Sequence, residues 1–75
     1  MRAGIVYTKL PINLIKFDFV DDDVSLLKES IKTYGLLQPV GVVRDSQSGY
    51  NLLFGKRRIK ACFELEQKYI HAVLL

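Results

Sequence analysis

"YNLLFGKRRIKACFEL", residues 50–65, joins an apolar run to three consecutive cations through a single glycine. The apolar run, residues 50–54, is typical of a β-strand. From Lys56 to about Gln67, polar side chains recur at spacings of three and four, which predicts an amphipathic helix with a core side made of Ile59, Cys62, Phe63 and Leu65. The stretch therefore predicts a strand and a helix that meet at Gly55.

The rest of the sequence predicts one more helix and three more strands. Residues 2–7 are expected to form a strand that Pro11 ends, and residues 10–17 are expected to be a connector. A helix follows over residues 24–34, with Gly35 as its stop and a core side made of Val24, Leu27, Ile31 and Tyr34. Residues 39–54 predict a hairpin with a turn at "SQSG", and residues 69–75 predict a last strand. The order β-α-β-β-α-β favours an α+β fold in which two helices pack on a small mixed β-sheet.

Length and composition place the chain among ordinary folded domains. Its 75 residues allow one domain, residues 1–75. Its one cysteine, Cys62, excludes an internal disulfide, and we expect it to be a small core residue. Because no stretch resembles a signal peptide or a membrane span, a cytoplasmic protein without a membrane partner is expected.

An acidic triplet, residues 21–23, precedes the first predicted helix. Carboxylates are favoured at the positive end of a helix, so we expect these aspartates to cap it. Consecutive residues point in different directions, and no further ligand stands at a suitable spacing, so a metal site is not expected.

The basic triplet lies where an anion is favoured. A strand-glycine-helix junction presents free N–H groups and the positive end of the helix dipole, both of which attract phosphate. Basic residues at a helix start are also common on a merely solvated face. "YGLLQP", residues 34–39, supplies a second helix end with a glycine, and it favours a phosphate pocket formed by Gly35, Leu36, Leu37, Gln38, Gly55, Lys56, Arg57 and Arg58.

The two arginines are separated by about 100° around a helix. Arg57 shares the solvent side with Lys60 and Glu64, whereas Arg58 points nearer the sheet. We therefore expect Arg57 to be the freer phosphate contact and Arg58 to have a structural role.

Three stretches, "SIKTYGLLQPVGVV", "GYNLLFGKRRIKAC" and "YIHAVLL", resemble the N-terminal domain of the ParB/Spo0J chromosome-partitioning family, which shares its fold with sulfiredoxin. The resemblance implies that Gly55, Arg57 and Arg58 line the phosphate site of a nucleotide such as CTP, bound with Mg²⁺, and that residues 35–38 form its other wall. It also implies a role in DNA partitioning or DNA-linked regulation and contact with DNA through a longer parent protein. Homodimer formation is compatible with the resemblance.

The sequence departs from this family at several points. Lys56 replaces a glutamate associated with hydrolysis, so weak NTPase activity at most is expected. The same position holds the reactive cysteine of sulfiredoxins, so sulfinic acid reduction is not expected. The helix-turn-helix and dimerisation regions are not part of the sequence, which indicates a fragment or a freestanding version of the domain.

Two other functions remain open. One is a non-enzymatic interaction module whose basic helix end docks an acidic protein or a DNA backbone. The weaker one is ATP-dependent phosphotransfer or nuclease activity, for which the sequence shows no catalytic carboxylate beside the loop.

Overall fold

The computed structural model describes residues 5–18, 21–35 and 38–75. Its helices and strands confirm the α+β class, the hairpin and both predicted helices. In chain order they are β1 (Val6–Pro11), the 3-10 helix η1 (Ile12–Leu14), β2 (Ile15–Lys16), α1 (Ser25–Tyr34), β3 (Val40–Arg44), β4 (Tyr50–Phe54), α2 (Lys56–Glu64) and β5 (Tyr69–Leu74).

The strands form one mixed sheet in the order β1-β5-β3-β4-β2. The β1–β5 and β3–β4 pairs are antiparallel, whereas β3–β5 and β2–β4 are parallel. β3 occupies the centre, where Val40 lies opposite Ala72 of β5. This position explains why Val40 and Val42 are completely buried.

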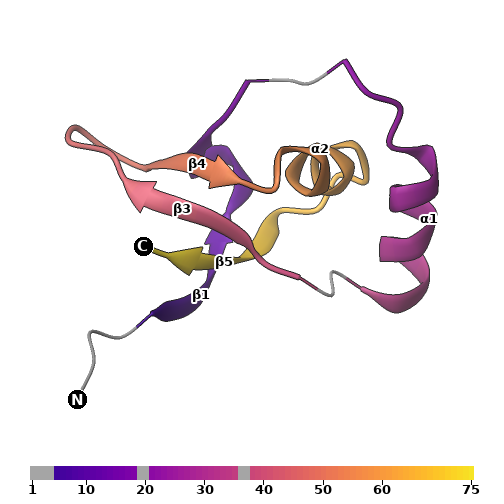
Figure 1. The fold of residues 1–75 in the computed structure, drawn as a ribbon, viewed down its shortest axis with the longest axis horizontal. Helices are drawn as coiled ribbons and strands as arrows, with labels where there is room; N and C mark the ends of the chain where they lie inside the picture. The colour runs from indigo at the N-terminus through magenta and orange to yellow at the C-terminus, as the bar shows by residue number, and fades with distance from the viewer. Residues whose placement is uncertain (1–4, 19–20, 36–37) are drawn as a thin grey trace.

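The two helices lie together at one side of the strands, and α2 lies between α1 and the sheet (Figure 1). Ile59 and Cys62 of α2 are fully buried, and α1 contributes Ile31 to the same core. The larger set of buried apolar residues also includes Leu10, Ile12, Ile15, Val24, Val40, Val42, Ala61, Ile70 and Ala72. Neither helix has the length and apolar character that a membrane crossing would need, as far as the described residues extend.

The N-terminal strand was predicted too early in the chain. Residues 2–4 of that prediction lie outside the described residues, and β1 runs from Val6 to Pro11. Pro11 does not end the strand before this point, because β1 is at the edge of the sheet. A proline on an edge strand can direct its missing N–H away from the neighbouring strand, so no hydrogen bond of the sheet is lost. The predicted connector also contains η1 and β2, and β2 pairs with β4 only at Ile15 and Lys16.

Two predicted core residues and one helix boundary were also wrong. Tyr34 is 71% exposed, and Phe63 is 48% exposed. Tyr34 stands in the last turn of α1, where helical spacing no longer ensures a packing partner. α2 ends at Glu64 because Glu66 adopts a left-handed conformation (φ 60°), which turns the chain toward β5.

Candidate phosphate-binding site

Gly55 connects β4 directly to α2. Its φ of 97° is in the left-handed region, which glycine adopts without a steric penalty. A β-carbon at this position would lie 2.7 Å from Cγ1 of Val40 and 3.2 Å from its Cα. Conformation and packing both require glycine at the junction.

The first turn of α2 has no side-chain cap and no acidic residue. The carbonyl oxygen of Gly55 accepts a hydrogen bond from the N–H of Ile59, at 2.9 Å. The preceding backbone donors have no helical acceptor, and the helix dipole makes this end positive. With the cations of Lys56 and Arg57 exposed beside it, the end of α2 is electrostatically suited to an anion.

Arg58 connects the two predicted parts of the site. Its Nη1 donates a 2.7 Å hydrogen bond to Oε1 of Gln38, and its side chain is half-buried. Gly35 ends α1 at φ 81°, with its N–H bonded to Ile31 O at 2.8 Å. Leu36 and Leu37 lie outside the described residues. The expected approach of the segment after α1 to the start of α2 is therefore seen at Gln38.

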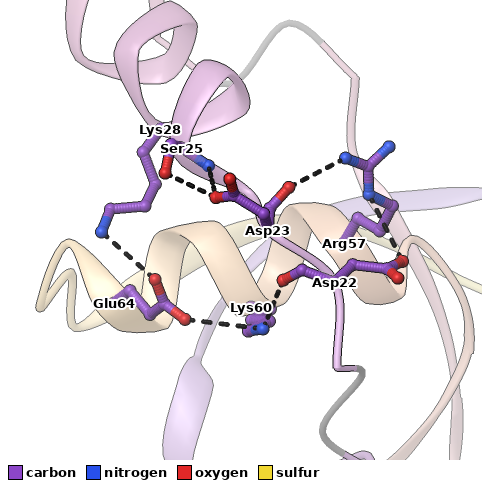
Figure 2. A network of polar contacts seen from close by, with 7 residues as sticks. All are labelled: Asp22, Asp23, Ser25, Lys28, Arg57, Lys60 and Glu64. Carbon is purple, nitrogen blue, oxygen red and sulfur yellow. Dashed lines mark hydrogen bonds and ion pairs between the residues drawn. The ribbon is translucent and has the colours of Figure 1, made fainter.

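Arg57 is more exposed than Arg58, as expected, but it also has contacts with the acidic segment that the sequence did not predict. Its Nη2 donates to the carbonyl oxygen of Asp23 at 3.4 Å, and its Nε lies 3.7 Å from Oδ2 of Asp22 (Figure 2). The side chains of Arg57 and Asp22 are both 58% exposed, so this ion pair is a weak surface contact. Angle around the helix identified the solvent side correctly but did not reveal that the acidic segment lies beside it.

Further contacts attach the same acidic segment to α2. Lys60 Nζ donates to the carbonyl oxygen of Asp22 at 2.6 Å, and Lys28 of α1 donates to Glu64 of α2 at 3.2 Å (Figure 2). Glu64 also lies 3.8 Å from Lys60. The start of α1 is thus braced along one side of α2.

The capping predicted for the triplet is seen only in part: Val24, not an aspartate, is the N-cap of α1 and makes no side-chain cap hydrogen bond, but Asp23 beside it binds Ser25 of the first turn. Oδ1 of Asp23 accepts hydrogen bonds from the Ser25 hydroxyl at 2.5 Å and from the Ser25 N–H at 2.9 Å. These two bonds, the hydroxyl first, lower the pKa of Asp23 below its ordinary value. Asp22 instead faces Arg57, which places a carboxylate, though not one with a shown catalytic role, beside the loop. The opposite charges of the two triplets were the sequence signal for this contact.

Lys56 lines a hollow of about 300 Å³ together with Lys16, Asp18 and Asn51. The charge of Lys16 is met by Asp45, whose Oδ2 lies 2.7 Å from Lys16 Nζ. Lys56, in contrast, forms no ion pair with a carboxylate of the described residues.

Cys62 is a core residue, as predicted. It is fully buried, and burial raises the pKa of its thiol to about 11. A neutral, inaccessible thiol is a poor nucleophile. Within residues 5–18, 21–35 and 38–75, no cluster of three or more His, Cys, Asp or Glu side chains is placed to hold a metal ion.

Comparison with known structures agrees with this geometry at the level of the fold. Sulfiredoxin from Arabidopsis thaliana superposes with a TM-score of 0.82 at 24% identity, over 93% of this chain and 84% of that protein. A truncated ParB from Caulobacter crescentus, complexed with CTP-γ-S, superposes with a TM-score of 0.76 at 23% identity, over 93% of this chain and 44% of that chain.

Comparison with known sequences identifies the family. The chromosome-partitioning protein ParB of Myxococcus xanthus is 35% identical over 80 residues, which cover 97% of this chain. This chain spans only 26% of the length of that relative. Residues 6–75 match the family defined as the ParB N-terminal domain. The chain therefore belongs to the ParB N-terminal domain family.

Proposed function

We propose that this domain binds a nucleoside triphosphate, CTP in the first instance, at the start of α2. Gly55, Lys56, Arg57 and Arg58 would hold the phosphates, and residues 35–38 would form the second wall. The observation that carries this proposal is the 2.7 Å hydrogen bond from Arg58 to Gln38, which joins these two segments.

Each phosphate-site residue has a separate task in this proposal. Gly55 lets the backbone donors of the first turn approach an anion closely. Arg58, positioned by Gln38, would contact phosphate with a fixed orientation. Arg57 would exchange its weak contacts with Asp22 and Asp23 for the more strongly charged ligand.

The relatives support the choice of nucleotide and the biological setting. The Caulobacter crescentus ParB structure contains CTP-γ-S, and the Myxococcus xanthus relative is a chromosome-partitioning protein. We accordingly place this domain in a DNA-partitioning process and expect contact with DNA through a longer parent protein.

Little hydrolysis is expected from this arrangement. Lys56 adds positive charge where the family usually carries a glutamate, which favours the anion but weakens placement of Mg²⁺. Mg²⁺ would be held largely by the phosphates of the nucleotide, as is common for this ion.

Calorimetric titration of CTP, ATP and GTP, each with and without Mg²⁺, tests the proposal. We expect saturable binding that prefers one base and is lost in Arg57→Ala and Arg58→Ala. Lys9→Ala, which removes an exposed cation from the edge strand β1, should leave the affinity unchanged. Binding of duplex DNA that ignores nucleotide and falls steeply with salt would instead identify a non-enzymatic interaction module.

A further inference from the structure

An open apolar groove lies between the η1–β2 segment and the C-terminal end of α2. Its volume is about 890 Å³, and we call it the Phe63 groove after one of its lining residues, which include Ile12, Phe17, Phe63, Lys68 and Tyr69. The described residues of the proposed phosphate site do not line it. The groove adjoins the hollow beside Lys56, with which it shares Lys16, Phe17 and Asp18.

Backbone hydrogen bonds hold the rim of the Phe63 groove in place. Ile12 N–H donates to Lys68 O at 2.9 Å, which fixes η1 against the start of β5. Glu66 N–H donates to Phe63 O at 3.0 Å, and Gln67 N–H donates to Cys62 O at 3.1 Å. The first bond links the two sides of the groove, and the other two fix the turn between α2 and β5.

Two aromatic side chains of this groove are about half exposed. Phe63 is 48% exposed, and Tyr69 is 53% exposed. Phe17 meets Phe63 edge to face, with ring centroids 6.4 Å apart and planes at 73°. Exposed aromatic residues gathered in a concavity are typical of a surface that another chain covers.

The charge around Tyr69 is positive. A second hollow, of about 380 Å³, shares Lys68 and Tyr69 with the Phe63 groove and adds Lys9 and His71. In the described part of the chain, Lys9 and Lys68 have no carboxylate within ion-pair distance. Among the described residues that line the groove, Asp18 is the one with a carboxylate, and Lys16 lies on the same side. A partner is therefore favoured that brings negative charge toward Lys9 and Lys68.

We propose that the Phe63 groove binds an acidic peptide segment that carries large apolar side chains. The apolar side chains would fill the groove between Phe17, Phe63 and Tyr69, and the carboxylates would meet Lys68 and Lys9. A single-stranded nucleic acid fits less well, because rings at 73° do not form a flat platform for stacked bases. A compact small ligand would leave much of both exposed rings in water.

Selection from a phage-displayed library of random short peptides tests this proposal on the intact chain. We expect the enriched peptides to combine Asp or Glu with Leu, Ile or Phe, and their binding to shift the amide resonances of Phe63, Lys68 and Tyr69. Phe63→Ala and Lys68→Glu should each weaken the best peptide about tenfold or more. The matched controls are Tyr7→Ala, an exposed aromatic on β1, and Lys32→Glu, an exposed cation on α1, and neither should change the affinity.

Several results would overturn the proposal. These are enrichment of no peptides or of basic ones, full affinity in both groove variants, and resonance shifts confined to residues 55–58. Tighter binding of an oligothymidine at the same resonances would assign the groove to nucleic acid. Dimerisation of the chain that Phe63→Ala abolishes would assign it to a second copy. Circular dichroism of each variant ensures that a loss of binding does not reflect unfolding.

Discussion

Arg58 and Gln38 are joined by a 2.7 Å hydrogen bond across a separation of 20 residues. The bond connects the first turn of α2 to the segment that leads from α1 into β3. An arginine that is half-buried needs such a partner, since an unpaired guanidinium is costly away from water. The two walls of the proposed phosphate site are therefore coupled before a ligand binds.

The first prediction concerns the energy of this coupling. A double-mutant cycle of Gln38→Ala and Arg58→Ala should give an interaction free energy of about 0.5–1 kcal/mol, because Gln38 is exposed and the bond is only partly shielded. Urea denaturation of the four proteins measures it. Additive effects of the two substitutions would show that the bond does not contribute to stability.

Gly55→Ala should be strongly destabilising, by about 2–4 kcal/mol. The reasons are a left-handed φ and a β-carbon that would approach Val40 too closely. Gly35→Ala is the matched control, because Gly35 also has a positive φ but its β-carbon would meet nothing within 4 Å.

The contribution of the clash can be separated from that of the conformation. Val40→Ala removes the nearest atom, Cγ1, so the double variant Gly55→Ala/Val40→Ala should lose less stability than the sum of the single variants. Denaturant midpoints give all three values. Strict additivity would mean that Val40 does not restrict residue 55.

Local features of the fold could be predicted from the sequence, whereas pairing between distant segments could not. The hairpin and the junction at Gly55 depend on residues close in sequence, and both were confirmed. β2 has only two residues, a length at which no alternating pattern exists, and it forms because β4 offers Tyr50 and Asn51 as partners. Pro11 was misread because its effect depends on being at a sheet edge, which the sequence does not specify.

The candidate site shows the same division. Residues 55–58 were predicted as phosphate contacts from charge and the helix start, and this role stays a prediction. The proximity of Gln38 to Arg58 was expected from a second glycine-bearing helix end. The contact of Arg57 with Asp22 was missed, because a helical period places a side chain on a face without showing which loop covers that face. The pocket itself, including Leu36 and Leu37, stays a prediction.

Glu66→Gly should stabilise the domain by about 0.5–1 kcal/mol. Glu66 has φ 60°, at the position after α2 where glycine is the usual residue, and removing the β-carbon relieves more strain than the added freedom of the unfolded chain costs. Gln67→Gly is the control and should not stabilise, since Gln67 is not among the positive-φ residues. A lower melting temperature for Glu66→Gly would contradict the assignment of strain to this residue.

Stability should fall in acid partly through Asp45. Hydrogen bonds from Lys16, then from Asn51 and the Gln47 backbone, hold the pKa of Asp45 well below its ordinary value of 3.8. A carboxylate with a lowered folded-state pKa stabilises the fold above its unfolded pKa, and this contribution is lost as the pH falls toward the folded value. The pH window is therefore below about 4.

Asp45→Asn tests this assignment by removing the titrating group. The variant should be less stable than the parent chain at neutral pH, and the difference should shrink below about pH 4. Thermal melting at several pH values measures it, with Asp21→Asn as the control, because Asp21 makes no hydrogen bond or ion pair to other described residues. If the stability difference between Asp45→Asn and the parent chain did not change with pH, the acid sensitivity would come from groups other than Asp45.

The last prediction is that Asp22 competes with phosphate for Arg57. Oδ2 of Asp22 lies 3.7 Å from Nε of Arg57 at an exposed position, so the ion pair is weak and a triphosphate can replace it. Asp22→Asn should therefore strengthen CTP binding by about twofold to fivefold, as expected for the loss of a surface pair of this kind. The gain should decrease with added salt, because salt screens exposed charges.

Asp21→Asn distinguishes this local competition from a change in overall charge. Both substitutions remove one negative charge from the same triplet, but of these two carboxylates only that of Asp22 forms an ion pair with Arg57 among the described contacts. Calorimetric titration of CTP into both variants, and into each combined with Arg57→Ala, gives the comparison. Equal gains in the two single variants, or a gain for Asp22→Asn that persists without Arg57, would mean that the acidic triplet acts only through its long-range field.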